Sequence, residues 1–267
     1  MIFWSTKKRR KRLMEQPLPL GRLKVIRENV RYYRLLPPED GKELEGLAQV
    51  FLAEKRYEGC GGLELTDEIC VTIAAQACVL LLHREPRMFP HVDVILVYPS
   101  AYLAPVRRHI GDGIVVEGPE VRAGESWYRG SVVLSWEDVI RDLKGLDPGR
   151  NVVLHEFAHQ LDHESGMADG TPLMEDPRLY RDWIRVFEEE YDNLVEEVEQ
   201  GFPTFLGDYA AVSPAEFFAV ATECFFEIPK GMKRRHPELY EVLTRFYRQD
   251  PALLLEAPSR RPGRLLH

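Results

Sequence analysis

The sequence predicts an α+β protein in which a small sheet is followed by a helix with a His-Glu-x-x-His pattern and accompanied by further helices. Three observations predict this class: helical periodicity before residue 85 and after residue 176, strand-like segments confined to residues 91–135, and the pattern itself at residues 155–159. The 267 residues suffice to bury a substantial core. We expect residues 13–256 to form one domain.

The first twelve residues are expected to form a basic tail. Positions 7–12 are an unbroken run of six basic residues, and the apolar residues precede this run. A secretory signal has the opposite order. A membrane-surface or nucleic-acid contact is the functional alternative, and a solvated, poorly ordered tail is the interpretation we favour. Residues 13–40 contain four prolines and are expected to have little regular structure.

Residues 41–85 are predicted to be helical. Leu44, Leu47 and Phe51 recur at helix spacing, and a glycine pair at residues 61–62 then interrupts the pattern. A second helix is expected from Thr66, whose hydroxyl is suited to cap it.

A small sheet is predicted within residues 91–135. Three segments rich in β-branched residues support it, at residues 91–98, 113–117 and 130–135. Turn-rich sequence separates them.

The helix that carries the histidines is predicted over residues 148–164. Asp147 and Pro148 resemble an N-cap followed by a proline at the first helical position, and Gly166 is a plausible stop. Further helices are expected over residues 176–247, beginning at Pro177, near Pro214 and at about residue 237. Residues 257–267 are rich in Pro and Arg, and we expect a loose tail.

Composition limits the classes of function. The net charge of −8 argues against nucleic-acid binding across the surface, so no direct nucleic-acid contact is expected. No apolar run approaches the roughly 20 residues of a transmembrane helix. The four cysteines form no Cys-x-x-Cys pair, and we expect reduced thiols in a cytoplasmic protein.

The His-Glu-x-x-His pattern indicates a catalytic zinc site. On a helix, His155 and His159 lie one turn apart and can hold one Zn²⁺, while Glu156 can act as general base for a water. One class of zinc protease adds a histidine six positions after the second, but Ser165 stands there. His163 lies a further turn along and is interpreted as a rim or surface residue.

A third ligand is therefore sought among later carboxylates. Glu216 is one candidate, although Ser213 and Glu216 also form a capping-box pattern in which Glu216 would bond back to the Ser213 amide. The residues alone leave both interpretations open. Glu223 is a competing ligand, and Glu227 is a more distant one.

Three separated segments carry a family resemblance: residues 155–162 (HEFAHQLD), 207–223 (GDYAAVSPAEFFAVATE) and 58–66 (EGCGGLELT). Together they resemble the Mlc titration factor A family, bacterial zinc peptidases whose catalytic domain is similar to that of anthrax lethal factor. The resemblance extends over roughly residues 10–250. It implies a zincin-like metalloprotease domain.

The resemblance also implies roles for five residues. His155, His159 and Glu216 would bind one zinc ion per chain, Glu156 would be the general base, and Tyr209 would stabilise the oxyanion or pass a proton. It implies aminopeptidase-like hydrolysis of short peptide substrates. The competing hypothesis is a regulatory protein that sequesters a transcriptional repressor, because members of the family are named for binding Mlc.

Two further expectations concern the surroundings of the site. Asp162, one turn beyond His159, could orient a ligand imidazole or cap the following segment. Residues 130–134, with Gly130, Val132 and Leu134, resemble a strand that lines the cleft of related peptidases and pairs with extended substrate. An ordinary sheet strand is the alternative.

Overall fold

The computed structural model describes residues 2–85, 87–110, 114–122, 124–126 and 130–256. Side chains are described for residues 6–101, except residue 86, and for residues 130–256. The expected strand residue Gly113 and the expected tail at 257–267 lie outside the described residues.

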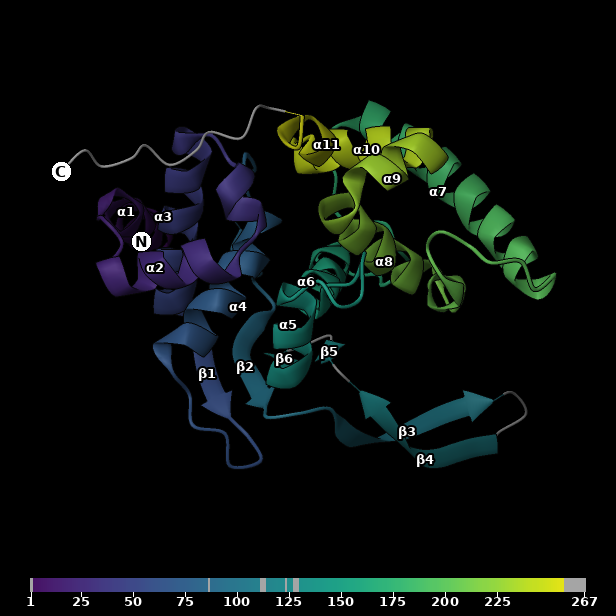
Figure 1. Cartoon of the computed structure of the whole chain (residues 1–267), viewed down its shortest axis with the longest axis horizontal. Coiled ribbons are helices and arrows are strands. Elements are labelled where there is room, and N and C mark those ends of the chain that lie inside the picture. The colour runs from purple at the N-terminus through teal and green to yellow at the C-terminus, as the bar shows by residue number, and fades with distance from the viewer. Residues whose placement is uncertain (1, 86, 111–113, 123, 127–129, 257–267) are drawn as a thin grey trace.

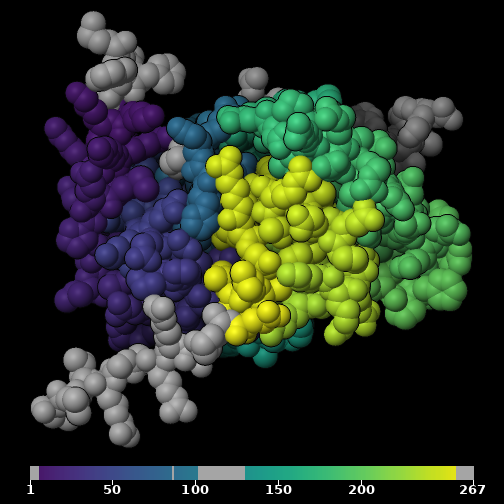
Figure 2. All heavy atoms as spheres, turned by 90° about the horizontal axis from the view of Figure 1, so that it is seen from above, coloured from purple at the N-terminus to yellow at the C-terminus, as the bar shows by residue number. Residues whose placement is uncertain are grey.

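The helices form two groups on either side of the helix that carries the histidines (Figure 1). Seen from above, the last helices of the chain lie between the N-terminal helices and α7 (Figure 2). The N-terminal group consists of α1 (Ile2–Glu15), α2 (Leu20–Asn29), η1 (Tyr32–Leu35), α3 (Pro38–Glu54) and α4 (Asp67–Val79). The later group consists of α7 (Pro177–Glu199), η2 (Asp208–Ala211), α8 (Pro214–Glu227), α9 (Pro229–Arg235), α10 (Pro237–Tyr247) and α11 (Pro251–Leu254).

The N-terminal segment is helical, which corrects the expectation of a loose tail. Arg9 and Arg10 of α1 both pair with Glu54 at the end of α3, at 2.9 and 2.8 Å. Gly46 lets the two helices approach closely, since a Cβ there would lie 3.1 Å from Met14. Part of the basic run is therefore neutralised within the chain.

Residues 13–40 are also more regular than expected. Pro19 immediately precedes α2, and Pro38 is the first residue of α3. Proline lacks an amide hydrogen and is suited to the first turn of a helix, where that hydrogen has no partner. Pro19 and Pro38 therefore mark helix starts, and the expectation of little regular structure is wrong.

The main sheet has the order β1-β2-β6-β5, comprising β1 (Arg56–Gly59), β2 (Val92–Tyr98), β6 (Gly130–Ser135) and β5 (Gly124–Ser126). The first three strands are parallel, and β5 pairs antiparallel with β6. The expected strands at 91–98 and 130–135 correspond to β2 and β6. Strand β1 falls inside a segment expected to be helical; its pairing with β2 stabilises it, because its own four residues lack a strand pattern.

The expected strand at residues 113–117 belongs, in its described part, to a different sheet. Residues from 114 onward form β4 (Ile114–Arg122), which pairs antiparallel with β3 (Tyr102–Ile110). This hairpin projects away from the helices (Figure 1). The helix-rich architecture with a small, mostly parallel sheet agrees with the predicted α+β class.

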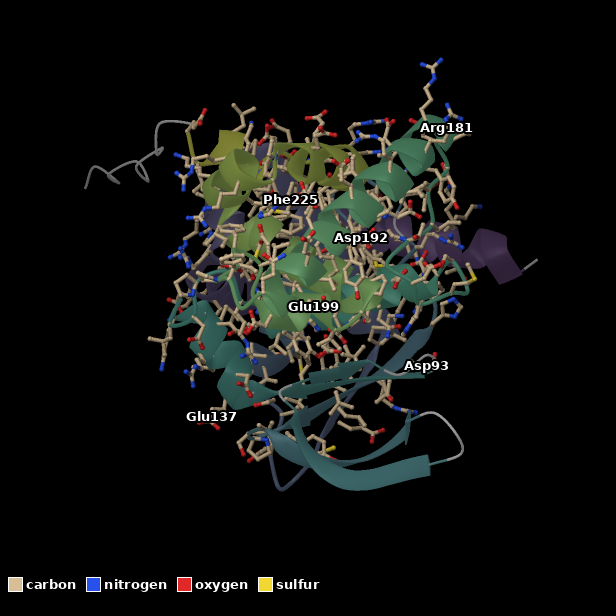
Figure 3. All side chains as sticks on the ribbon, turned by 90° about the vertical axis from the view of Figure 1, so that its right-hand side faces the viewer. Asp93, Glu137, Arg181, Asp192, Glu199 and Phe225 are labelled. Atoms are coloured by element: carbon tan, nitrogen blue, oxygen red, sulfur yellow. The ribbon has the colours of Figure 1, made fainter. Side chains whose placement is uncertain are left out.

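Local capping accounts for several helix starts. Thr66 Oγ1 accepts a hydrogen bond from the Ile69 amide at the start of α4, and Asp176 accepts one from the Arg178 amide at the start of α7. Helix α7 presents its acidic residues to solvent, as Asp192 and Glu199 show in Figure 3. In the described part of the chain, no helix has the length and apolar character needed to cross a membrane.

Candidate metal centre

Helix α6 (Val152–His163) presents both histidines of the pattern. Its N-cap is Asn151, whose Oδ1 accepts a hydrogen bond from the Leu154 amide at 3.1 Å. Asp147 pairs with Arg141 instead, so the expected start at residue 148 is wrong. Gly149, two residues before Asn151, has a φ of +88°, which favours glycine. A Cβ at this position would lie 2.8 Å from the side chain of Ile228.

Three candidate ligand atoms converge where α6 meets α8. The Nε2 atoms of His155 and His159 lie 3.2 Å apart, and Glu216 Oε2 lies 3.1 Å from the first and 3.4 Å from the second. Bonds of about 2.0–2.1 Å to a tetrahedral zinc ion separate ligand atoms by about 3.3 Å. The triangle and its two-histidine, one-carboxylate donor set therefore fit zinc.

Helix α8 directs the Glu216 carboxylate toward the histidines. Ser213 Oγ accepts a hydrogen bond from the Glu216 amide at 3.2 Å and so caps α8. The Glu216 side chain lies against His155 and His159. Only the serine half of the capping box is thus formed, and the carboxylate is available to a metal.

Glu223, the competing candidate for third ligand, does not lie at the triangle of donor atoms. Its Oε1 lies 2.8 Å from Nδ1 of His155, on the opposite edge of the imidazole from Glu216. Glu227 is further away, and its Oε1 accepts a hydrogen bond from Nδ2 of Asn151 at 2.8 Å. Of the three candidate carboxylates, Glu216 alone joins the triangle.

The electrostatics of the site favour a cation. Burial alone would raise the pKa of Glu216, but the imidazoles of His155 and His159 beside its carboxylate lower it well below its usual range. Burial lowers the pKa of His155, yet Glu223 and Glu216 raise it well above its ordinary value. This negative surrounding field suits a divalent metal ion.

The structure places Glu156 and Tyr209 beside this triangle. Glu156 is 5% exposed and acts electrostatically on His155. Tyr209 lies on η2 with its ring centroid 6.0 Å from that of His155, and it is 57% exposed. Tyr191 Oη donates a hydrogen bond to the Ala211 carbonyl at 3.1 Å, which holds η2 against α7. A buried carboxylate and an accessible phenol therefore flank the same histidine.

Asp162 takes the second of its two expected roles. Its Oδ2 accepts a hydrogen bond from the Gly170 amide at 2.9 Å, and burial raises its pKa to about 6. A Cβ at Gly170 would lie 2.4 Å from the Pro214 carbonyl oxygen. Asp162 therefore holds the segment after α6 against the start of α8, near Glu216. His163 is half-buried and lies outside the triangle, in agreement with a rim position.

The expectation that residues 130–134 face a substrate is wrong. Strand β6 pairs with β2 on one side, and over Val132 to Leu134 it pairs with β5 on the other. The side chains of Val132 and Leu134 are fully buried, and Gly130 lies at the start of the strand with φ of +99°. β5, which lies next to α6, is the end strand of the sheet.

Sequence reasoning missed the polar residues that surround the start of α6. Asn151 Nδ2 donates hydrogen bonds to Gln76 and Glu227, and Asp142 accepts one from the Val152 amide at 2.7 Å. An asparagine three positions before Leu154 is a recognisable capping signal. Asp142 lies on α5 (Trp136–Leu143), and no local sequence signal indicates its contact with the Val152 amide. The contact forms only because the fold brings α5 to the start of α6.

A second cluster of Asp40, Glu43 and His83 was also not anticipated. His83 Nε2 lies 3.4 Å from Asp40, and its Nδ1 lies 3.4 Å from Glu43. The two carboxylates face different nitrogens of one ring.

Asp142 leads to a pH-dependent prediction. Burial raises its pKa to about 7 despite the hydrogen bond from the Val152 amide, whereas an unfolded Asp titrates near 3.9. The folded state then binds more protons between these values, so this group's contribution to stability falls as pH rises from about 4 to about 7. In Asp142→Asn that loss is absent. We therefore compare the free energy of unfolding of the variant with that of the wild type at each pH. As pH rises from acidic to alkaline, this difference should shift in favour of the variant by on the order of 2–4 kcal/mol.

Urea unfolding of both proteins at pH 5 and pH 8 measures this difference. An equal difference at the two pH values would show that Asp142 does not titrate in this range.

Helix α6 offers two histidines and an adjacent glutamate, and a carboxylate from α8 faces them beside a small sheet. This combination is typical of a metallopeptidase. The chain belongs to the family described as glucose-regulated metallo-peptidase M90, which matches residues 4–248. Membership implies a bound metal ion.

Named relatives agree with this assignment. The chain is 40% identical to the uncharacterized protein slr2042 of Synechocystis sp., over 92% of this chain and 90% of that protein. It is 34% identical to Mlc titration factor A of Serratia proteamaculans, over 83% and 86%, and 34% identical to Mlc titration factor A of Pectobacterium atrosepticum, over 83% and 84%. These relatives confirm the resemblance that the sequence segments indicated.

Proposed function

We propose that this protein is a zinc-dependent peptidase of the cytoplasm, with His155, His159 and Glu216 as the zinc ligands. The observation that carries the proposal is the triangle of three donor atoms, whose edges of 3.1–3.4 Å match the ligand spacing of a tetrahedral zinc ion. The four cysteines are free thiols, which suits a reducing compartment.

The chain's own residues supply the proton transfers of peptide hydrolysis. When bound, the zinc ion polarises the scissile carbonyl and lowers the pKa of a water toward about 7. Glu156 accepts the proton of the attacking water and delivers it to the leaving amine. Tyr209 donates a hydrogen bond from its phenolic hydroxyl to the oxyanion, a role that suits its exposed place beside His155.

The substrate is a peptide that lies extended along β5. As the end strand of the sheet, β5 can pair with a further chain on its outer edge, and it lies next to α6. Backbone pairing would hold the scissile bond across the histidines without demanding particular side chains. Release of amino-terminal residues from short peptides is the specificity that the resemblance to the Mlc titration factor A family favours.

Metal removal and restoration tests the proposal. The zinc-loaded chain is incubated with a mixed peptide library, and product ends are identified by mass spectrometry. We expect cleavage that a chelator abolishes and that added zinc restores, with single residues released from the amino end. Absence of cleavage by a chain with bound zinc would contradict the peptidase assignment, and internal cuts would contradict the aminopeptidase specificity.

Sequestration of a transcriptional repressor is a second candidate function, favoured by the name Mlc titration factor A of two relatives. Binding of a repressor need not use the proton chemistry of Glu156. Co-purification of an Mlc-type repressor with both the wild type and Glu156→Gln would support this function, and failure of both to retain it would oppose it.

A further inference from the structure

The imidazole of His155 is held on both edges by carboxylates from the same helix, α8. Glu216 Oε2 lies 3.1 Å from its Nε2, and Glu223 Oε1 lies 2.8 Å from its Nδ1. Both glutamates have restricted exposure, and Glu223 is buried. Because an ionised carboxylate oxygen only accepts hydrogen bonds, the ring nitrogen that faces Glu223 carries the hydrogen. When the ring is neutral, a hydrogen on Nδ1 leaves the lone pair of Nε2 free for a metal.

Glu223 is itself held by the start of α6. Its second oxygen, Oε2, accepts a hydrogen bond from the backbone amide of Asn151, which is the N-cap of the helix that carries His155. One carboxylate therefore joins the first residue of the helix to a side chain one turn further along. The N-terminal end of a helix also favours a negative charge at this point.

The side chain of Asn151 connects this arrangement to two other helices. Its Nδ2 donates to Gln76 Oε1 of α4 at 2.7 Å and to Glu227 Oε1 of α8 at 2.8 Å. These contacts use every hydrogen of the side-chain amide, and Oδ1 caps α6 through the Leu154 amide. Hydrogen bonds to α4, to α8 and within α6 therefore hold the Asn151 side chain in place.

We propose that Glu223 and Asn151 are positioning residues, in which Asn151 orients Glu223 and Glu223 sets the tautomer and angle of His155 for zinc. This inference rests on the proposed zinc site and adds to it the groups that prepare one ligand. It also connects the N-terminal helices to the site, from Gln76 on α4 through Asn151 and Glu223 to His155.

Substitution of Glu223 by glutamine tests the first step. A glutamine oxygen can accept from only one of the two donors, while its NH₂ group must face the other, so one hydrogen bond is lost. If the NH₂ group faces His155, the ring must carry its hydrogen on Nε2, where zinc would bind. We expect Glu223→Gln to weaken zinc binding by about 10–100-fold, measured by competition with a chromophoric chelator on the full chain.

Glu189→Gln is the matched control. It makes the same change of charge on α7, at a side chain that is 65% exposed and lies outside the contacts of Glu223 and Asn151. We expect unchanged zinc affinity in this variant. A loss as large as that of Glu223→Gln would assign the effect to the lost charge alone and would overturn the proposal.

The tautomer of His155 provides a readout that a merely structural role would not change. Ring nitrogen chemical shifts of the zinc-free chain, recorded at a pH above the pKa of His155 so that the ring is neutral, should show hydrogen on Nδ1 in the wild type and in Glu189→Gln, and on Nε2 in Glu223→Gln. Wild-type affinity together with the wild-type tautomer in Glu223→Gln would overturn the proposal.

Two further variants address folding and the role of Asn151. Glu223→Asp keeps the charge but shortens its reach, so an intermediate zinc affinity is expected, and wild-type affinity would contradict the proposal even if Glu223→Gln does not fold. Asn151→Ser keeps a capping oxygen and the backbone amide but removes both Nδ2 bonds. A reduced zinc affinity is expected there, and an unchanged one would remove Asn151 from the arrangement.

The outcome for these residues is separable from that of the proposed function. If Glu156→Gln cleaves peptides as the wild type does, the assigned mechanism fails, while zinc affinity and the His155 tautomer still decide the roles of Glu223 and Asn151. If Glu223→Gln keeps full zinc affinity, the positioning roles fail whether or not the chain is a peptidase.

Discussion

Replacing Glu156 with glutamine is expected to lower kcat for peptide hydrolysis by about 10²–10⁴-fold, the usual contribution of a general base. Glutamine has nearly the same shape and fits the same buried place, but it cannot accept the proton of a water at neutral pH. Because Glu156 is not a member of the ligand triangle, zinc content should remain that of the wild type. Initial rates on a fluorogenic peptide, measured alongside metal content, give both quantities.

A surface variant on α7, Glu189→Gln, serves as the control for Glu156→Gln, because this side chain is 65% exposed and lies on another helix. It should retain the wild-type rate. A Glu156→Gln protein that keeps its zinc and cleaves within a few-fold of wild type would exclude Glu156 as the base. Parallel loss of zinc and of activity would instead point to a role in holding the metal.

Phe157→Ala is expected to lower the free energy of unfolding by about 3–5 kcal/mol, in the range for a buried phenylalanine. Phe157 follows Glu156 on α6 and packs into the core, where it is fully buried. Its ring lies 4.7 Å from that of Phe89 and 5.6 Å from that of Phe51, measured between centroids. The truncation would leave a cavity between α6, α3 and the segment before β2.

Urea denaturation of the zinc-free chain measures this loss. Phe202→Ala, at a phenylalanine that is 54% exposed, is the control and should change stability by less than about 0.5 kcal/mol. Similar values for the two variants would show that the aromatic contacts of α6 do not dominate its anchoring. A large loss for Phe157→Ala alone would connect the position of the histidines to the core beneath them.

Local signals allowed several elements to be predicted from the sequence. Thr66, Asp176 and Ser213 each cap the helix that follows them, because a short polar side chain satisfies a free amide within three residues. The strands at β2 and β6 were recognisable for a similar reason, since their β-branched residues form continuous apolar runs. In each case the deciding interactions lie within a few residues of one another.

Elements that depend on distant partners were missed. β1 exists because β2 lies beside it, and α1 is ordered by ion pairs between its arginines and Glu54, more than forty residues away. The expected strand at residues 113–117 lies, in its described part, in a separate hairpin, because its pairing partner is β3 and not a strand of the main sheet. Periodicity within one segment carries no information about such partners.

For the candidate site, the sequence by itself determined that two histidines share one face of a helix with a glutamate beside them, since spacing along an α-helix places residues four apart one turn from each other. It left open which carboxylate completes the set. Only the tertiary structure separated Glu216, which lies at Nε2 of both histidines, from Glu223, which lies at Nδ1 of one. The physical reason is that the two glutamates lie seven residues apart on α8, and their roles depend on how that helix packs across α6.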